Sequence, residues 1–302
     1  TYIFHAHSAP FFVVIQGRLM KKISYITTCK NRLSHLQQTL PTLVEQPHHE
    51  IIVVDYNCPE HTGDWVEQHL PSVKVLRVTD DSGWCCPRAR NQGASIATGD
   101  YLCFVDADVV VQPGWADWWQ DNLHALFHYR AAPINGERVK DTWGTVMVPT
   151  FFFRAIRGYD EAFSGWGGED GDLYERLQNA GCPERQYPGQ LVTALAHEDS
   201  ERLTYSPVSS MECQHTINAS YRKAKRVLLA LQWPRPHLDL ETRNLLYAEA
   251  TKRVLSWADE NNTEPFELSL QFAMETTLPS GLAVKQNCML SLKSEGTENA
   301  VG

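Results

Sequence analysis

The sequence predicts an α/β fold built around an open, mostly parallel sheet with helices on its faces. Two β-branched and apolar runs, Ile23–Thr28 and Glu50–Asp55, are typical of strands, and leucines recur at helical spacing from Leu33 to Leu43 between them. The second run is apolar until it closes on an acid, as is typical of a parallel strand covered on both faces. Strand, helix and strand in this order indicate a βαβ unit and therefore an α/β architecture.

The remaining elements follow from the same patterns in chain order. We expect a helix, a strand, a helix and a strand over Trp65–Leu70, Val73–Val78, Arg88–Thr98 and Tyr101–Val105. After Pro113 we expect a helix with three tryptophans, a strand-like stretch and a glycine-rich segment, over residues 115–119, Trp143–Phe153 and Gly165–Gly171. Helical apolar spacing over Ile217–Trp233 and Leu238–Trp257 predicts a mainly helical C-terminal extension.

Composition excludes several classes of protein. The 302 residues hold 27 Lys and Arg against 36 Asp and Glu, a net charge of −9, and a duplex nucleic-acid partner would need a basic face. We therefore expect no nucleic-acid partner.

The apolar stretch near the N-terminus, Pro10–Ile15, is far shorter than the ~20 residues that cross a bilayer, so we expect no transmembrane segment. The eight cysteines form no CxxC pair, which favours free thiols and a cytoplasmic location.

Two carboxylates follow the strand that ends at Val105. In an extended Asp106-Ala107-Asp108 segment, residues two apart point the same way, so both acids would face one ligand beyond the carboxyl edge of the sheet. Such oxygen ligands suit Mg²⁺ or Mn²⁺ bridging a diphosphate. A solvated loop with two acids is the alternative that an isolated triplet leaves open.

The segment that leads into these acids carries a family resemblance. Arg90-Asn91-Gln92-Gly93, followed by the Asp106-Ala-Asp108 strand, resembles the nucleotide-sugar glycosyltransferases of the GT-A fold, especially family 2. The resemblance implies a Rossmann-like GT-A fold. It also implies that Asp55 and Arg90 contact the uracil and that Thr28 and Arg32 lie along the nucleotide. It further implies that Asp108 binds the metal and that Asp106 lies near the ribose or the metal. Tyr56 departs from the pattern, because many family members carry a second acid there.

A second motif is glycine-rich and acidic. Gly165-Trp166-Gly167-Gly168-Glu169-Asp170 resembles the acceptor motif of β-1,4-galactosyltransferases, and a tight turn opening a helix is the structural alternative. The resemblance implies that Trp166, Gly167 and Gly168 bind the acceptor. It also implies that Asp170 is the catalytic base and that Glu169 orients the sugar, because retaining relatives carry Asn at the position of Asp170.

A histidine further along is a candidate third metal ligand. In the galactosyltransferase-like group a His some 25 to 30 residues after the acceptor motif completes the metal site, and His197 lies 27 residues after Asp170. An imidazole ligand biases a site of this kind toward Mn²⁺ over Mg²⁺. A surface or packed histidine is the alternative.

These motifs predict a metal-dependent glycosyltransferase that moves a hexose-type sugar from a UDP-sugar to a saccharide hydroxyl with inversion. A nucleotidyltransferase acting on sugar phosphates and a catalytically silent sugar-binding module are the alternatives. We expect an N-terminal extension over 1–19, a GT-A domain over 20–202 and a helical extension over 203–302. The GT-A domain divides into a nucleotide-sugar half, 20–112, and an acceptor half, 113–202.

One basic stretch bears on location. The residues Arg222, Lys223, Lys225 and Arg226 precede an apolar run, and a basic amphipathic helix can bind an anionic membrane surface. Peripheral contact at the inner face of the membrane is therefore one expectation. A helix face packed on the catalytic domain is the interpretation that we favour.

Overall fold

The computed structural model describes residues 21–46, 50–196, 204–206, 208–231, 237–259, 267–277, 281 and 283–293. The predicted N-terminal extension, 1–19, lies outside these residues. Within them, no helix is long and apolar enough to cross a membrane. The seven cysteines whose side chains are described are free thiols.

A seven-stranded mixed sheet forms the centre of the molecule, in the order β3-β2-β1-β4-β7-β6-β8. Its strands are β1 (Ile23–Cys29), β2 (Glu50–Tyr56), β3 (Lys74–Val78), β4 (Tyr101–Phe104), β6 (His128–Ala131), β7 (Val146–Pro149) and β8 (Glu184–Tyr187). The pairs β1–β2, β2–β3 and β1–β4 are parallel, and β7 runs antiparallel to both β4 and β6. The predicted α/β fold with a mostly parallel sheet is confirmed. A short sheet, β5 (Val109–Val111) with β9 (Val192–Ala194), follows β4.

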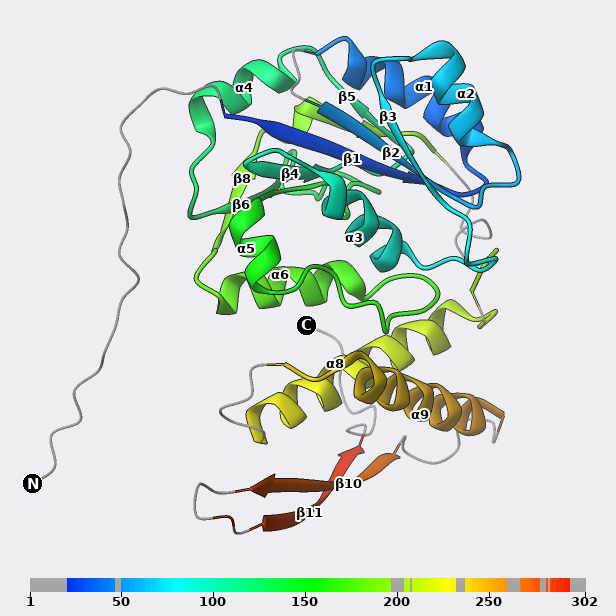
Figure 1. Ribbon diagram of the computed structural model, residues 1–302, viewed down its shortest axis with the longest axis vertical. Helices are drawn as coiled ribbons and strands as arrows, with labels where there is room; N and C mark the ends of the chain where they lie inside the picture. Colours follow the sequence, from blue (N-terminus) through cyan, green and yellow to red (C-terminus); the bar gives the residue numbers. More distant parts are fainter. Residues whose placement is uncertain are drawn as a thin grey trace, which may run out of the picture.

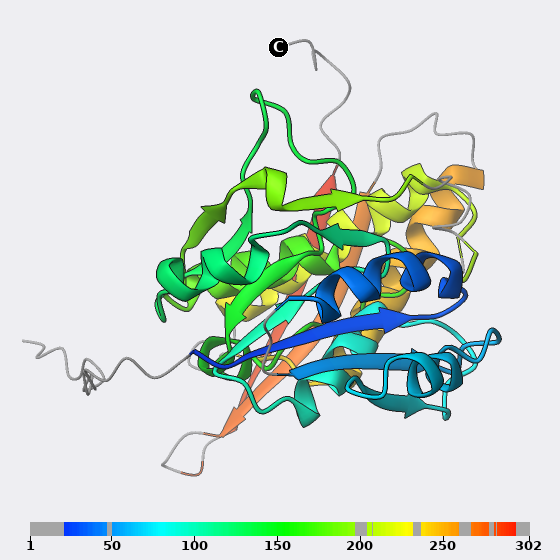
Figure 2. The ribbon, with the colours of Figure 1, turned by 90° about the horizontal axis from the view of Figure 1, so that it is seen from above.

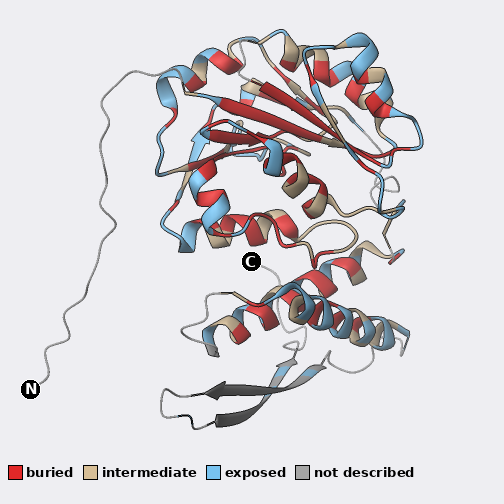
Figure 3. Cartoon of the chain, viewed as in Figure 1, coloured by how far each residue is buried: buried red, intermediate tan, exposed pale blue. Residues whose placement is uncertain are grey.

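Helices cover both faces of the sheet (Figures 1 and 2). One face packs on α1 (Leu33–Val44), α2 (Thr62–His69) and α4 (Trp115–Asn122). The other face packs on α3 (Cys86–Ile96), α5 (Thr150–Ala155) and α6 (Glu169–Asn179). The central strands β1 and β2 are buried along nearly their whole length (Figure 3), as expected for parallel strands covered on both faces.

One sequence prediction needs correction, and the C-terminal extension has one further element. The strand expected over Trp143–Phe153 ends at Pro149, the partner of Tyr101 at the start of β4, and Thr150 begins helix α5. Thr150 closes this corner with hydrogen bonds from its amide to the Asp100 carbonyl (2.9 Å) and from its hydroxyl to the Gly99 carbonyl (2.7 Å). The C-terminal extension contains a β-hairpin as well as helices.

The C-terminal extension packs under the acceptor half of the domain (Figure 1). The predicted helices are present as α8 (Met211–Leu231) and α9 (Leu240–Asp259), which form a third core together with Ala162 and Phe163 of the catalytic domain. The unpredicted hairpin joins β10 (Glu267–Thr277) to β11 (Ala283–Lys293) in antiparallel register. Apolar residues alternate along the sequence of β10, which is the strand signal that the helical reading missed.

Candidate active site

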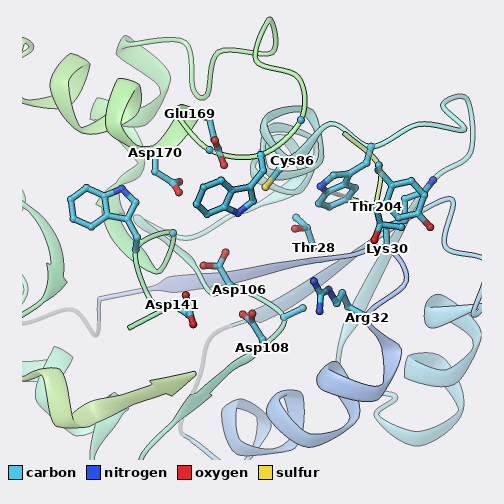
Figure 4. A pocket seen from close by; sticks show the side chains of 18 of the residues that line it. Thr28, Lys30, Arg32, Cys86, Asp106, Asp108, Asp141, Glu169, Asp170 and Thr204 are labelled. Carbon is cyan, nitrogen blue, oxygen red and sulfur yellow. The ribbon is translucent and has the colours of Figure 1, made fainter. Parts of the chain in front are cut away.

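A cavity of about 900 Å³ opens beyond the carboxyl ends of β1 and β4 (Figure 4). Among the segments that line it are residues of Thr28–Arg32 after β1, the turn Asp106–Asp108 after β4, and the loop Gly165–Asp170 that leads into α6. The predicted donor and acceptor motifs therefore meet in one cavity. The segments after β1 and β4 meet because parallel strands end at one edge of the sheet, and the acceptor loop reaches the cavity from α6, which packs on one face of the sheet.

The two predicted metal-side acids lie in a tight turn. β4 ends at Phe104, and the Val109 amide donates to the Asp106 carbonyl at 3.0 Å, so Asp106–Val109 is a β-turn and not the extended segment that we expected. Both side chains nevertheless line the cavity, together with Asp141 (Figure 4). The extended geometry that we expected is therefore wrong, and the roles of both acids at a metal stay predictions.

Arg90 is the central side chain of the site. It is buried on α3, and its guanidinium donates to Asp106 Oδ1 and Asp170 Oδ1, both at 2.6 Å, while Glu169 Oε1 lies 3.8 Å away. Its planar fork also lies over the Tyr159 ring, 5.0 Å from the centroid. One cation thus joins the acid after β4 to the acids at the start of α6. The predicted contact of Arg90 with uracil stays a prediction.

Gly144 makes room for this arrangement. A Cβ at Gly144 would lie 2.4 Å from Arg90 Nη2 and 2.5 Å from Asp106 Oδ2. Real Cβ atoms do not approach other atoms so closely, so a side chain here would displace the ion pair. Sequence reasoning missed Gly144, because nothing local to it distinguishes this glycine from one in a loop.

The rest of the Arg-Asn-x-Gly motif has structural roles. Asn91 accepts from the Tyr159 amide at 2.8 Å and donates to the Tyr159 carbonyl at 3.0 Å, which fastens α3 to the segment before the acceptor loop. Gly93 lets α3 approach the sheet, since a Cβ there would lie 2.5 Å from Ile26 Cγ2. The motif therefore holds Arg90 at a fixed height above the sheet.

The adjacent carboxylates of Glu169 and Asp170 are buried at the N-terminus of α6. Burial raises the pKa of Glu169, the charge of Asp170 raises it further, and Arg90 acts in the opposite direction. Burial also raises the pKa of Asp170, against the ion pair with Arg90. Since Arg90 donates directly to Asp170, the arrangement favours a charged Asp170 beside a protonated Glu169.

Glycines shape the loop before these acids. Gly165, Gly167 and Gly168 have φ values of +80°, +83° and +92°, which other residues rarely adopt. The turn exposes Trp166 to the cavity, where its ring lies 5.5 Å from that of His215 on α8. The sequence did not identify His215, because it comes from the C-terminal extension.

The predicted donor residues differ in their placement. Thr28 and Arg32 line the cavity. Asp55 does not line it: its carboxylate accepts from the amides of Cys58 (2.8 Å) and Gly63 (2.7 Å), which orders the turn after β2. Its contact with uracil stays a prediction.

Lys30 is a further cavity-lining residue that we did not predict. Its ammonium donates to the carbonyls of Tyr56, Asn57 and Ser82 at 3.1 to 3.3 Å and so joins β1, β2 and the loop before α3. Tyr56, which replaces the family's second acid, donates its hydroxyl to Asp81 at 2.5 Å. Asp81, from a neighbouring loop, thus places a carboxylate beside the position where many family members carry a second acid.

The described residues include two of the three predicted metal ligands. Asp106 and Asp108 supply the carboxylate oxygens that Mg²⁺ and Mn²⁺ prefer, and such ions retain water and phosphate ligands. Among the described side chains no group of three His, Cys, Asp or Glu is arranged as a complete metal cluster. The predicted ligand His197 lies outside the described residues. The residues present fit a hard divalent cation that takes its remaining ligands from elsewhere.

Comparisons with known proteins agree with this geometry. Residues 24–163 match the family model of glycosyl transferase family 2, and residues 137–198 match that of the N-terminal domain of galactosyltransferase. This chain is a glycosyltransferase that is similar to family 2 over residues 24–163. Its sheet and helices have the GT-A fold, and the galactosyltransferase match spans the Gly-Trp-Gly-Gly-Glu-Asp loop.

Several individual proteins resemble this glycosyltransferase. Validoxylamine A glucosyltransferase of Streptomyces hygroscopicus subsp. jinggangensis is 23% identical over 321 residues, which cover 85% of this chain and 73% of that protein. Beta-1,4-galactosyltransferase 5 of Homo sapiens is 66% identical over 29 residues, 10% of this chain and 8% of that protein. The crystal structure of GalNAc-T7 with UDP, GalNAc and Mn²⁺ has a TM-score of 0.51 at 16% identity, over 80% of this chain and 57% of that one.

Proposed function

We propose that this glycosyltransferase moves a hexose-type sugar from a UDP-sugar to a saccharide hydroxyl with inversion, assisted by Mn²⁺ or Mg²⁺. The observation that supports the proposal is the cavity in which Arg90 joins the acid after β4 to the acids of the acceptor loop. Donor and acceptor would therefore lie at opposite carboxylates of one buried cation. A silent sugar-binding module would have no need of this connection.

The donor side would hold the charged diphosphate. Lys30 and Arg32 line the cavity after β1, and Asp106 and Asp108 face them across it (Figure 4). These two acids would hold the metal, whose chemistry is to neutralise the charge that develops on the departing UDP. Such a metal accords with the Mn²⁺ and UDP bound in the GalNAc-T7 structure.

The acceptor side would supply the base. Asp170 uses Oδ1 to accept from Arg90, and we assign Oδ2 to accept the proton of the attacking hydroxyl. Glu169, whose burial favours the protonated form, would donate a hydrogen bond that orients the sugar. Trp166 would provide an apolar plate for a sugar ring. A base on the face opposite the leaving diphosphate gives inversion, so an α-linked donor would yield a β-linked product.

A panel of donors and acceptors tests this proposal. UDP-glucose, UDP-galactose, their N-acetylated forms and UDP-glucuronate are each incubated with Mn²⁺ and the methyl β-glycosides of glucose, N-acetylglucosamine and xylose. We expect UDP release that an acceptor accelerates, with a β-linked product by NMR. Conversion of the UDP-sugar and added pyrophosphate to UTP and a sugar 1-phosphate, without release of UDP, would indicate a nucleotidyltransferase, and an α-linked product would contradict the assignment of Asp170.

Metal dependence is tested in the same assay. Chelation with EDTA should abolish UDP release, and added Mn²⁺ should restore it. Asp108→Ala should weaken UDP binding measured by calorimetry in the presence of Mn²⁺, because it removes a carboxylate from the turn that lines the cavity. Full activity after chelation would overturn the metal assignment.

A further inference from the structure

The acceptor loop is held from behind by side chains of the C-terminal extension. Asn218 on α8 donates from Nδ2 to the carbonyls of Trp166 (3.0 Å) and Gly167 (2.7 Å). Gln214, one turn earlier, donates to the Ser164 carbonyl at 3.0 Å, and the hydroxyl of Tyr247 on α9 donates to the same carbonyl at 2.6 Å. The carbonyls of this short loop are thus bound by residues some 50 to 83 positions away in the sequence.

These three side chains form one buried network, which we name the loop clamp: Gln214, Asn218 and Tyr247. The Oδ1 atom of Asn218 accepts from Gln214 Nε2 at 3.2 Å and lies 2.9 Å from the Tyr247 hydroxyl, whose one hydrogen is shared between this oxygen and the Ser164 carbonyl. Gln214 is fully buried and Asn218 is 4% exposed. Buried amides with this many partners fix one rotamer each, because any other rotamer leaves polar groups unpaired.

The packing between the loop clamp and the loop is tight. A Cβ at Gly168 would lie 2.9 Å from Asn218 Cβ, and a Cβ at Gly165 would lie 2.3 Å from Gln214 Oε1. The glycines of the acceptor motif therefore serve the contact with α8 as well as the turn. The same contact sets the side of the loop that faces the cavity, where Trp166 and His215 line the wall.

The position of the loop matters for the chemistry because Glu169 and Asp170 follow it directly. The Asp172 amide donates to the Gly168 carbonyl at 3.1 Å, so the clamped loop and the first turn of α6 are continuous. A displacement of Gly167 or Gly168 would move Asp170 relative to the acceptor. Small misplacements of a reacting group cost large factors in rate.

We propose that Gln214, Asn218 and Tyr247 are positioning residues for acceptor binding, which makes the C-terminal extension part of the acceptor site. The inference rests on the proposed function for the identity of that site. The loop clamp contacts the acceptor loop through its carbonyls, and the donor residues after β1 and β4 belong to other walls of the cavity. Loss of the loop clamp therefore impairs use of the acceptor and leaves the donor in place.

Two variants and a control on the same helix test the proposal. Asn218→Ala removes both donations to the loop, and Tyr247→Phe removes one hydroxyl while keeping the ring that packs on Phe163. Thr216→Ala lies between Gln214 and Asn218 and removes a hydrogen bond to Glu212 within α8. The measurements are UDP affinity with Mn²⁺, UDP release without acceptor, acceptor KM for the best methyl glycoside of the panel, and amide hydrogen exchange of residues 164–168.

We expect Asn218→Ala to raise the acceptor KM and the exchange rate of residues 164–168 by about tenfold or more, from two lost hydrogen bonds. Tyr247→Phe should raise both by a smaller factor. UDP affinity and acceptor-free UDP release should stay within about twofold of the parent protein, as with Thr216→Ala. If exchange in both variants matched Thr216→Ala, or if acceptor-free release fell as far as transfer, the positioning role would be wrong.

Failure of the proposed function gives a different result. A parent protein that releases no UDP from any donor contradicts the proposed reaction. Amide hydrogen exchange still tests the loop clamp in that case. Faster exchange confined to residues 164–168 in the two variants supports the loop clamp, and unchanged exchange overturns it.

Discussion

Asp170 and Asp172 lie two residues apart in the first turn of α6, yet they belong to opposite kinds of charge cluster. Asp170 faces the cavity, where Arg90 is within 4 Å of three carboxylates: Asp106, Glu169 and Asp170. Asp172 faces the C-terminal extension and pairs with Lys225 of α8 and Arg176 of α6. The cluster around Arg90 has more acidic than basic side chains. The cluster around Asp172 has enough basic side chains to pair with all of its acids.

The second cluster, which we name the interdomain network, centres on Asp160. This carboxylate accepts from Lys225 at 2.6 Å, from the Tyr221 hydroxyl at 2.6 Å and from Arg243 of α9. Although burial opposes its ionisation, Lys225 and Arg243 lower the pKa of Asp160 to about 2. A buried carboxylate with this many cationic and hydroxyl partners stays charged, and its hydrogen bonds hold two parts of the chain together.

The comparison teaches how one short segment can combine stability with chemistry. In the cavity, burial and the charge of Asp170 raise the pKa of Glu169, and the excess of acids over bases favours binding of a cation at the neighbouring acids. In the interdomain network, Lys225 and Arg243 satisfy the acids, so we expect no role for them in proton transfer. The predictions below test this division.

Lys225→Met should have the largest effect on stability. It leaves Asp160 and Asp172 buried without their shared ammonium, and breaking a buried ion pair from one side costs about 3–5 kcal/mol. Chemical denaturation at pH 7 measures the loss. Lys223→Met on the exposed side of α8 is the matched control, and equal unfolding midpoints for the two variants would show that the interdomain network does not stabilise the fold.

Gly144→Ala should have an intermediate effect, located in the cavity. The new methyl group would overlap Arg90 and Asp106, and forcing atoms into a packed site costs about 1–3 kcal/mol. We expect weaker UDP binding with Mn²⁺ and a lower unfolding midpoint. Gly83→Ala is a suitable control, since its nearest contact is 3.2 Å, to the side chain of Asp81. Parent-like UDP affinity in Gly144→Ala would contradict the tight contact.

Glu169 should give an effect that is visible only as a dependence of stability on pH. Because its pKa is raised in the fold, the native state binds a proton that the unfolded state releases above about pH 4.3, the ordinary value for Glu. The contribution of Glu169 to the unfolding free energy is fully present below that pH, and it is lost as the pH rises toward the raised pKa. The slope for one group is at most about 1.4 kcal/mol per pH unit.

Glu169→Gln removes this slope because glutamine does not titrate. Unfolding midpoints of the metal-free protein and of Glu169→Gln, measured from pH 5 to pH 8, should converge at low pH and separate as the pH rises, with the variant the more stable. Parallel curves would show that Glu169 is ionised in the fold throughout this range.

Much of the fold and the outline of the site could be predicted from the sequence, because both depend on local patterns. The apolar runs of β1 and β2 identify buried parallel strands, and acids placed after strands collect at one edge of a sheet. This is why the residues after β1 and the Asp106 turn were expected to share an edge of the sheet, whereas the contact of the Asp106 turn with Asp170 depends on Arg90.

The unpredicted features depend on contacts between distant parts of the chain. Gly144, His215 and Asn218 carry no local signal, and each acquires its role from residues brought to it by the fold. Asn218 also begins an Asn-Ala-Ser triplet that the sequence alone would offer for glycosylation, and its buried, hydrogen-bonded amide excludes that use in the folded protein. Three of the four basic residues on α8 likewise pair with acids of the catalytic domain, as the packed-helix interpretation predicted.

The division between the two clusters is tested most directly by one pair of isosteric variants, Asp170→Asn and Asp172→Asn, measured for turnover and for unfolding free energy. Asp170→Asn should lower turnover by roughly 10²–10⁴, the usual contribution of a general base, while UDP binding and stability stay close to those of the parent. Asp172→Asn should retain turnover at low temperature and lose about 1.5–3 kcal/mol of stability, the contribution of hydrogen bonds to a charged group. Normal turnover in Asp170→Asn, or a loss of turnover in a stable Asp172→Asn protein, would contradict the assignment of chemistry to one cluster and stability to the other.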